Sequence, residues 1–368
     1  MNILWIYGLT ESSGYARNSR EFIKALNANG VTTKFLSLGH SKYPEKAIMG
    51  KWEAETGYSY DLVVQNCVPP AFKKFGNKKN ILMTVAETDS VSQEWVKCCN
   101  TADEVWTMSY YSQAAFIHSG VTVPVRVVLM PIDIQAIQSA GRIKSPEIAE
   151  QLNKFRAKCS FIFMANSEWT PRKGWDILLH SFCKVFAPYE DIGLMIKTCC
   201  FSGVETSQSM ARLVKQIKEQ YDAKCPVFII NDVMDIEDVW TLYKFADAFV
   251  LPSRGEGCGI PFLEAMSMGL PTVMPSHGGQ VDYANDMLCT RVKSYLRPAH
   301  RFPHNPNYDE TMLWIETDQN ELSDKLMSVI MNHNKERNEL GRGQFIETFS
   351  YDGTAIKDFI KIAEVVIK

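Results

Sequence analysis

Short apolar runs alternate with stretches of helical spacing along almost the whole chain. The apolar runs that read as strands cover residues 3–7, 33–38, 62–65, 81–85, 104–108 and 126–129, and then 160–165, 193–198, 227–230, 248–251 and 271–274. Strands of a parallel sheet are buried on both faces and therefore read as continuous apolar runs, with helices between them. The pattern predicts an α/β protein built from parallel sheets.

The strand series is interrupted once, by a polar segment of helical composition at residues 139–158. We therefore predict a first domain over residues 1–140, a linker, and a second domain over residues 159–345. A chain of 368 residues, 46% of them hydrophobic, is long enough for two cores.

Composition narrows the class of protein. The net charge of -3 excludes a globally basic nucleic-acid binder, although a local basic patch stays possible. No run approaches the roughly 18 to 20 apolar residues of a membrane span, and the start of the chain is too short for a signal peptide. The 10 cysteines and 7 histidines lack metal-site spacing. We expect reduced thiols, no metal site and a cytoplasmic protein.

A glycine-rich segment follows the apolar run at residues 248–252. Its three glycines, Gly255, Gly257 and Gly259, allow the backbone to come close to a ligand. Pro261 suits the first turn of a helix, which Gly269 would end. A helix start after a glycine loop favours anions, because free amides and the helix dipole both attract negative charge.

Charged side chains surround this predicted anion site. Glu256 and Glu264 flank it, and carboxylates can bind hydroxyl groups. Arg172 and Lys173 lie in another strand-to-helix turn, at the carboxyl end of a strand, where α/β sheets bind ligands. Cations there would stabilise a diphosphate leaving group. The combination indicates a site for a sugar nucleotide.

The frame Glu256, Gly257, Gly259, Pro261, Glu264 and Ala265 resembles the donor signature of retaining glycosyltransferases of family 4. The resemblance implies the GT-B architecture, in which two Rossmann-like doubly wound domains face each other across a cleft. It implies that Glu256 contacts the donor sugar and Glu264 the ribose. The intervening amides of Gly257, Cys258, Gly259 and Ile260 would face the diphosphate.

Further positions follow from the same resemblance. Arg172 and Lys173 match the family's basic turn, but Glu168 stands where many members have an additional arginine, so Arg172 would take its place. Asn231 and Val233 would lie beside the donor base, and Gly14 beside the donor phosphate. The last helix, about residues 350–368, would pack back on the first domain. Asp235 reads as the cap of a helix over residues 236–245.

The acceptor side is less defined. Glu87 and Asp89 end a predicted strand and could contact the acceptor, although Asp89 could equally cap a helix. His277 is more simply a structural or solvated loop histidine than a base. A second basic cluster interleaved with Tyr295 could hold a phosphorylated or nucleic-acid acceptor; it comprises Arg291, Lys293, Arg297, His300 and Arg301.

These features predict a retaining transfer of sugar from a UDP- or GDP-type donor to an acceptor hydroxyl. Glu256, Arg172 and Lys173 would be the catalytic residues. No cofactor is expected beyond the donor substrate, and no Asp-x-Asp motif is present for a divalent ion. The acceptor could be a glycan, a lipid or a modified, hydroxymethylated DNA base, as in some bacteriophages. An epimerase or an inactive sugar-nucleotide-binding subunit are the other readings, and no pattern specifies the oligomeric state.

Overall fold

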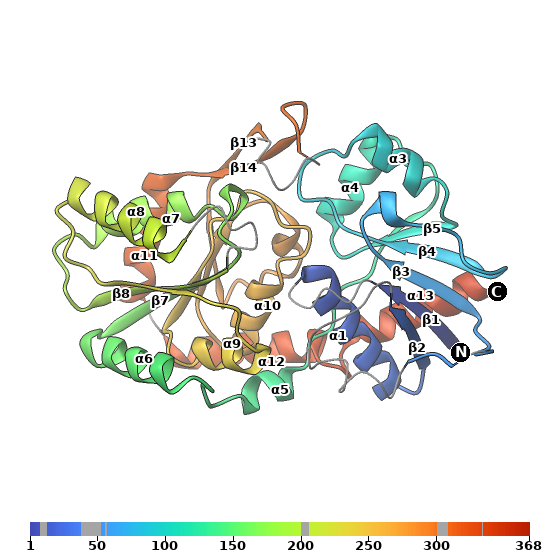
Figure 1. The fold of residues 1–368 in the computed structure, drawn as a ribbon, viewed down its shortest axis with the longest axis horizontal. Coiled ribbons are helices and arrows are strands. Elements are labelled where there is room, and N and C mark those ends of the chain that lie inside the picture. Colours follow the sequence, from blue (N-terminus) through green and yellow to red (C-terminus); the bar gives the residue numbers. More distant parts are fainter. Residues whose placement is uncertain (8–12, 38–52, 56, 200–205, 300–307, 333) are drawn as a thin grey trace. The chain divides into compact units, whose positions relative to one another are not determined.

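The computed structural model describes residues 1–7, 13–37, 53–55, 57–199, 206–299, 308–332 and 334–368. The chain folds into two compact units (Figure 1). The first unit combines Met1–Ile134 with Ile346–Lys368, and the second is Gln135–Phe345. Each unit has its own sheet and core, and each is described separately below.

The first unit contains a parallel six-stranded sheet in the order β2-β1-β3-β4-β5-β6. Its strands are β1 (Asn2–Tyr7), β2 (Thr32–Ser37), β3 (Leu62–Asn66), β4 (Lys79–Met83), β5 (Glu104–Thr107) and β6 (Val125–Val127). Its helices include α1 (Gly14–Ala28), α3 (Gln93–Cys99), α4 (Tyr110–Ser119) and α13 (Thr354–Ile367). The strand order reverses direction between β1 and β3, which is where doubly wound sheets bind ligands.

The end of the chain completes the core of the first unit. Phe359 of α13 lies with its ring centroid 6.3 Å from Trp5, 5.2 Å from Phe22 and 5.0 Å from Trp106. All four side chains are fully buried. Burial of one such aromatic side chain stabilises a fold by about 2–3 kcal/mol. Helix α13 is therefore an integral part of the first unit, although more than 200 residues separate it from the first sheet.

The second unit contains another parallel six-stranded sheet, ordered β12-β11-β10-β7-β8-β9. Its strands are β7 (Phe161–Asn166), β8 (Ile192–Thr198), β9 (Val227–Asn231), β10 (Ala248–Val250), β11 (Thr272–Pro275) and β12 (Cys289–Val292). Counted within the unit and read from β9, this is the dinucleotide-fold order 3-2-1-4-5-6. The fold class predicted from the sequence, two doubly wound Rossmann-like domains, is confirmed.

Helices cover both faces of the second sheet. On one side lie α7 (Trp175–Val185), α8 (Ser207–Gln220) and α11 (Gln319–Met331), and on the other lie α6 (Pro146–Lys158) and α9 (Ile236–Tyr243) (Figure 1). The unit also contains α5 (Ile134–Ser139), which spans the boundary, α10 (Ile260–Ser267) and α12 (Lys335–Phe349), whose end reaches the first unit. None of the helices in the described residues is long and apolar enough to cross a membrane.

The predicted linker is part of the second unit. Phe155 of α6 packs on Phe228 of β9, with ring centroids 5.3 Å apart. Arg156 pairs with Asp247 and anchors the same helix to the start of β10. The boundary between the two units falls after Ile134, before the predicted linker at residues 139–158. Helix α6 belongs to the second unit because it packs an apolar face on the sheet, although its outer surface is polar.

Three strands are absent from the sequence-based prediction. β12 is short and carries a threonine and an arginine, and the antiparallel hairpin of β13 (Ser294–Pro298) and β14 (Leu313–Thr317) has an outer strand that is largely exposed. Neither the edge strand nor the hairpin has the continuous apolar character of a central strand.

Candidate active site

The two segments that carry the predicted donor residues lie side by side at the carboxyl ends of β7 and β10. These two strands are neighbours, and the strand order of the second sheet reverses between them. Loops that leave adjacent strands at such a switch point diverge and open a binding crevice. The fold therefore brings Arg172 and Lys173 to Glu256, which is 84 residues away from Arg172 in the chain (256 − 172).

The basic turn is held closely against the second loop. Pro171–Lys173 form one turn of 3-10 helix, and Gly174 follows with φ +68°, a left-handed conformation that favours glycine. A Cβ at Gly174 would lie 2.1 Å from the carbonyl oxygen of Pro252. Only glycine allows this approach, which places Lys173 within reach of the glutamate.

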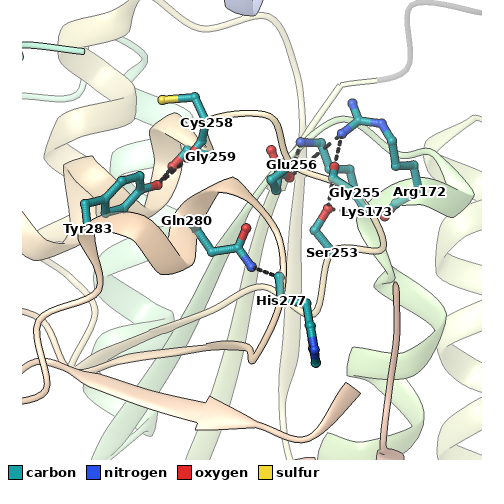
Figure 2. Close-up of polar contacts among 10 residues, drawn as sticks. All are labelled: Arg172, Lys173, Ser253, Gly255, Glu256, Cys258, Gly259, His277, Gln280 and Tyr283. Carbon is teal, nitrogen blue, oxygen red and sulfur yellow. Dashed lines mark hydrogen bonds and ion pairs between the residues drawn. The ribbon is translucent and has the colours of Figure 1, made fainter. Parts of the chain in front are cut away.

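Glu256 is buried and compensated by both cations (Figure 2). Lys173 Nζ donates to Glu256 Oε1 at 2.5 Å, and Arg172 Nη1 lies 3.9 Å from the same oxygen. Arg172 also donates to the carbonyl of Gly255 at 2.6 Å. Burial alone would raise the pKa of Glu256, but the charges of Lys173 and Arg172 outweigh it and hold that pKa below its ordinary value. The carboxylate is therefore ionised near neutral pH.

The ion pair should be visible in the pH dependence of stability. A lowered folded-state pKa stabilises the fold above the unfolded-state value, about 4.5, and the contribution is lost as the pH falls through the folded-state value. Glu256→Gln is expected to lower the free energy of unfolding by roughly 3 kcal/mol at pH 7, because it removes the negative charge beside the partly buried Lys173 and Arg172. Urea denaturation of both proteins at pH 7 and at pH 3.5 measures this difference.

The matched control is Glu219→Gln, which removes an exposed pair with Lys215 on α8. That variant is expected to change the free energy of unfolding by less than about 1 kcal/mol. A Glu256→Gln effect of equal size at both pH values would contradict the ionised pair.

The first turn of α10 is shaped by Tyr283. Its hydroxyl donates to the carbonyls of Cys258 and Gly259 at 2.6 and 2.7 Å (Figure 2). Gly259 is the residue before the helix and has φ +82°, and a Cβ there would lie 2.8 Å from the ring of Phe262. α10 then runs from Ile260 to Ser267, in agreement with the predicted start and end. Gly257, Cys258 and Gly259 thus lead directly into a helix N-terminus, whose amides and dipole favour an anion.

Neighbouring groups support this loop without adding a reactive side chain. The amide of Gly279 donates to the Glu256 carbonyl at 2.8 Å. Burial raises the pKa of the Cys258 thiol to about 12, so it is neutral and packs as a small apolar group. His277 is exposed, and its imidazole points away from Glu256 (Figure 2).

Glu264 is the most deeply buried carboxylate of the predicted site, at 2% exposure. One oxygen accepts from Trp240 Nε1 and the other from the Tyr243 hydroxyl, both at 2.9 Å. Asn166, at the end of β7, donates to the Tyr243 oxygen at 3.2 Å. Glu264 therefore belongs to a hydrogen-bonded network at the switch point. The sequence analysis missed Trp240 and Tyr243; their spacing of three residues on α9 places them on one helix face, but their shared partner comes from another helix.

The residues predicted beside the donor base follow β9. Asn231 donates to Ser207 Oγ at 3.1 Å. Val233 is 52% exposed, and its amide donates to the carboxylate of Asp232 at 2.7 Å. A buried lysine, Lys197, supports this loop by donating to the carbonyls of Thr198 and Asp232 at 3.0 and 2.9 Å. Asn231 and Val233 thus lie at the expected strand end, with side-chain and backbone partners of their own.

Asp235 and Asp89, the two carboxylates considered as helix caps, differ in their relation to the helices that follow them. Asp235 occupies the position before α9, but its carboxylate makes no capping hydrogen bond and pairs instead with Lys144 at 2.5 Å. Asp89 does not cap α3, because Ser92 accepts from the amide at the start of that helix. Asp235 therefore stands at the predicted N-terminal position of α9, whereas Ser92 and not Asp89 caps α3.

The remaining predicted residues lie in the first unit, at the carboxyl end of its sheet. Gly14 begins α1; residues 8–12 of the preceding loop lie outside the described part of the chain. The neighbouring Tyr15 bonds to Thr84 at 2.9 Å, and burial together with the charge of Glu87 raises its pKa. Asp89 accepts from Ser90 Oγ at 3.1 Å. Gly14 and Glu87 thus follow strands β1 and β4 on the same edge of the sheet.

A cavity of about 580 Å³ lies elsewhere in the second unit, between α8 and the edge strand β9. Its lining includes Val214, Lys218, Val227 and Asn231, of which only Asn231 is a predicted donor residue. The cavity follows the length of the edge strand, whereas the chemistry of the site gathers at the strand ends. We therefore place the site at the switch point rather than in this cavity.

Comparison with known proteins shows which class of protein the chain resembles. The family described as "Glycosyl transferases group 1" matches residues 158–297. Mannosylfructose-phosphate synthase of Agrobacterium fabrum is 30% identical over 121 residues, which are 32% of this chain and 26% of that protein. The chain thus spans about a quarter of that relative's length.

Solved structures agree over the whole chain. A glycosyltransferase from Rickettsia africae has a TM-score of 0.72 at 17% identity, with 100% of this chain and 98% of that one covered. Anabaena HepE in complex with UDP and glucose has a TM-score of 0.67 at 15% identity, with 99% and 100% covered. The fold is that of the GT-B enzymes, and the group 1 match includes the basic turn and the glutamate loop. The protein is a glycosyltransferase of the GT-B type.

Proposed function

We propose that this glycosyltransferase moves a sugar, with retention of its anomeric configuration, from a UDP- or GDP-type donor to an acceptor hydroxyl. The observation that carries the proposal is the contact of Lys173 and Arg172 with Glu256 beside the start of α10. Cations, helix amides and an ionised carboxylate then meet within one small region. Cations and helix amides bind a diphosphate, and an ionised carboxylate accepts hydrogen bonds from the hydroxyls of a sugar.

Lys173 and Arg172 would stabilise the charge that develops on the departing diphosphate. In the folded protein they already balance the charge of Glu256, so their positions are fixed before a donor binds. Preorganised cations lower the barrier because they need not be reoriented during the reaction. They can take the role that a divalent ion has in other transferases, which supports transfer without a metal.

Glu256 would orient the sugar rather than attack it, because its carboxylate is engaged by Lys173. In the proposed step the bond between the anomeric carbon and the diphosphate oxygen breaks. A bond from the acceptor oxygen forms on the same face, and the acceptor proton passes to the leaving diphosphate. Retention follows from this geometry, and the resemblance of the Glu256–Glu264 frame to retaining enzymes supports it.

Among acceptors, the structure gives less support to DNA than to a glycan or a lipid. Two members of the predicted basic cluster have acids beside them: Arg291 pairs with Asp286 at 3.2 Å, and the Lys293 ammonium lies near Asp318 and Glu321. His300 and Arg301 lie outside the described residues. Acids beside these two basic side chains weaken their attraction for a phosphate backbone. Glu256 and Glu264 are both in place, which argues against an inactive subunit.

The test is a screen of radiolabelled UDP- and GDP-sugars against glycan, lipid and hydroxymethylated-DNA acceptors, with product anomers assigned by NMR. We expect one donor and acceptor pair to give a product with the donor's anomeric configuration, with and without EDTA. An inverted product would overturn retention, and loss of product in EDTA would overturn metal independence. Release of a free epimer would identify an epimerase, and binding of donor without transfer or hydrolysis would identify an inert subunit.

A further inference from the structure

Arg254 of the second unit makes five side-chain hydrogen bonds and has no role in the reaction proposed above. Its guanidinium makes two hydrogen bonds to Asp176, at 2.8 and 2.7 Å, and two to Glu316, at 2.6 and 3.3 Å. A further bond goes to the carbonyl of Pro171 at 2.5 Å. The ring of Trp314 lies 5.9 Å from the guanidinium carbon. The side chain is 9% exposed.

These contacts join three segments that are distant in sequence. Asp176 lies in the first turn of α7, directly after the basic turn, and Glu316 lies on β14 of the hairpin. Arg254 itself lies two residues before Glu256. The backbone of Arg254 also bonds to the other two segments. The Arg254 amide donates to the Arg172 carbonyl at 2.6 Å, and the Arg254 carbonyl accepts from the Ile315 amide at 2.7 Å.

The cation is strongly favoured at this position. Burial opposes the charge of Arg254, but hydrogen bonds and charges of Asp176 and Glu316 outweigh it and raise the pKa of the guanidinium above its ordinary value. Two parallel bonds to each carboxylate fix direction as well as distance, which a lysine cannot reproduce. The arrangement therefore specifies the relative positions of the three segments.

We propose that Arg254 is a positioning residue that holds the Arg172–Lys173 turn against the Glu256 loop and makes the β13–β14 hairpin a structural part of the donor site. The inference rests on the proposed function, since it concerns the same cations and carboxylate. Arg254 acts through Lys173 and Glu256 and contacts no reacting atom. Displacement of positioned groups by about 1 Å can cost a hundredfold in rate, so the contribution of this residue is kinetic.

The stacked side chains of Trp169 and Trp175 can serve as a spectroscopic probe of the Arg172–Lys173 turn. The two rings flank it in sequence, lie 4.7 Å apart and differ by 9° in orientation. Rings this close couple in near-ultraviolet circular dichroism, and the signal depends on their mutual angle. The turn geometry can thus be followed without any assay of transfer.

The experiment compares Arg254→Gln and Arg254→Lys with wild type in the full chain, with Arg156→Gln as the matched control. Arg156 also pairs with a partly buried carboxylate of this unit, that of Asp247, but it lies on α6, away from the turn. We expect Arg254→Gln to lower kcat roughly 10- to 100-fold, with the donor KM changed less than about threefold. Arg254→Lys should recover part of this loss. The Trp169–Trp175 signal should weaken in Arg254→Gln, weaken less in Arg254→Lys and stay unchanged in Arg156→Gln.

Each outcome decides the proposal. If Arg254→Gln lowers Tm as Arg156→Gln does but leaves kcat and the tryptophan signal unchanged, Arg254 is only structural. If Arg254→Gln does not fold, Glu316→Gln replaces it, with Asp176 still bound to the guanidinium; unchanged kcat and signal there also overturn the inference. If wild type transfers no sugar from any donor, the proposed function fails, while the tryptophan signal still tests whether Arg254 fixes the turn.

Discussion

Replacement of Lys173 by alanine is expected to lower donor turnover about a hundredfold or more, with the fold retained. The ammonium is the group nearest to Glu256 Oε1, at 2.5 Å, and it lies where a departing diphosphate would gain negative charge. Loss of one preorganised donor to a developing anion costs roughly 10²–10³ in kcat. Because the variant also removes the nearer of the two cations beside Glu256, inhibition by inorganic pyrophosphate should weaken as well. Steady-state rates with a radiolabelled donor measure the first effect, and competition with pyrophosphate the second.

Lys215→Ala is the control for the lysine variant. Lys215 also pairs with a glutamate of the second unit, Glu219 at 3.7 Å, but its side chain is 76% exposed on α8. Its loss should leave both turnover and pyrophosphate inhibition unchanged. Full turnover in Lys173→Ala would remove the cation from the mechanism and, with it, the assignment of the basic turn to the donor diphosphate.

Replacement of Glu264 by alanine is expected to lower donor turnover by a similar factor, about a hundredfold, through a different part of the donor. If this carboxylate holds the ribose, the variant should bind UDP or GDP more weakly while inorganic pyrophosphate inhibits it as before. The removal also deletes the carboxylate that accepts from Trp240 Nε1 and from the Tyr243 hydroxyl, and loss of these two hydrogen bonds costs about 1–3 kcal/mol of stability. Calorimetric titration with UDP and GDP, together with a denaturation curve, separates the two effects.

Trp240→Phe is the matched control, because it removes one hydrogen bond to Glu264 and keeps the carboxylate and an aromatic ring. We expect less than a tenfold loss of turnover. Equal losses in Trp240→Phe and Glu264→Ala would show that the network, not the carboxylate, carries the effect. Unchanged nucleotide affinity in Glu264→Ala would contradict the ribose contact.

Local sequence patterns were sufficient to predict the central strands and the start of α10. The apolar runs at residues 160–165 and 248–251 correspond closely to β7 and β10, because strands buried on both faces tolerate few polar residues. Pro261 and Gly269 bracket α10 as expected, since each residue type restricts the backbone at its own position. Both signals act over a few neighbouring residues.

Contacts between residues far apart in the chain could not be predicted from such local patterns. Asp235 precedes α9 as predicted, but its carboxylate pairs with Lys144, which is 91 residues away in the chain (235 − 144). The apolar face of α6 and the hairpin that reaches Arg254 were missed for the same reason. A given residue type has the same letter in the sequence whether its side chain lies on the surface or in a buried hydrogen-bonded network.

The sequence by itself determined the doubly wound fold and the residue types of the donor site, because hydrophobic periodicity and glycine or proline positions are local constraints. Tertiary structure decided which of those residues meet. The reversal of strand order between β7 and β10 brings Lys173 to Glu256, and Arg254 joins both loops to the hairpin. Such contacts depend on the packing of segments up to about 140 residues apart (316 − 176), which no local pattern contains.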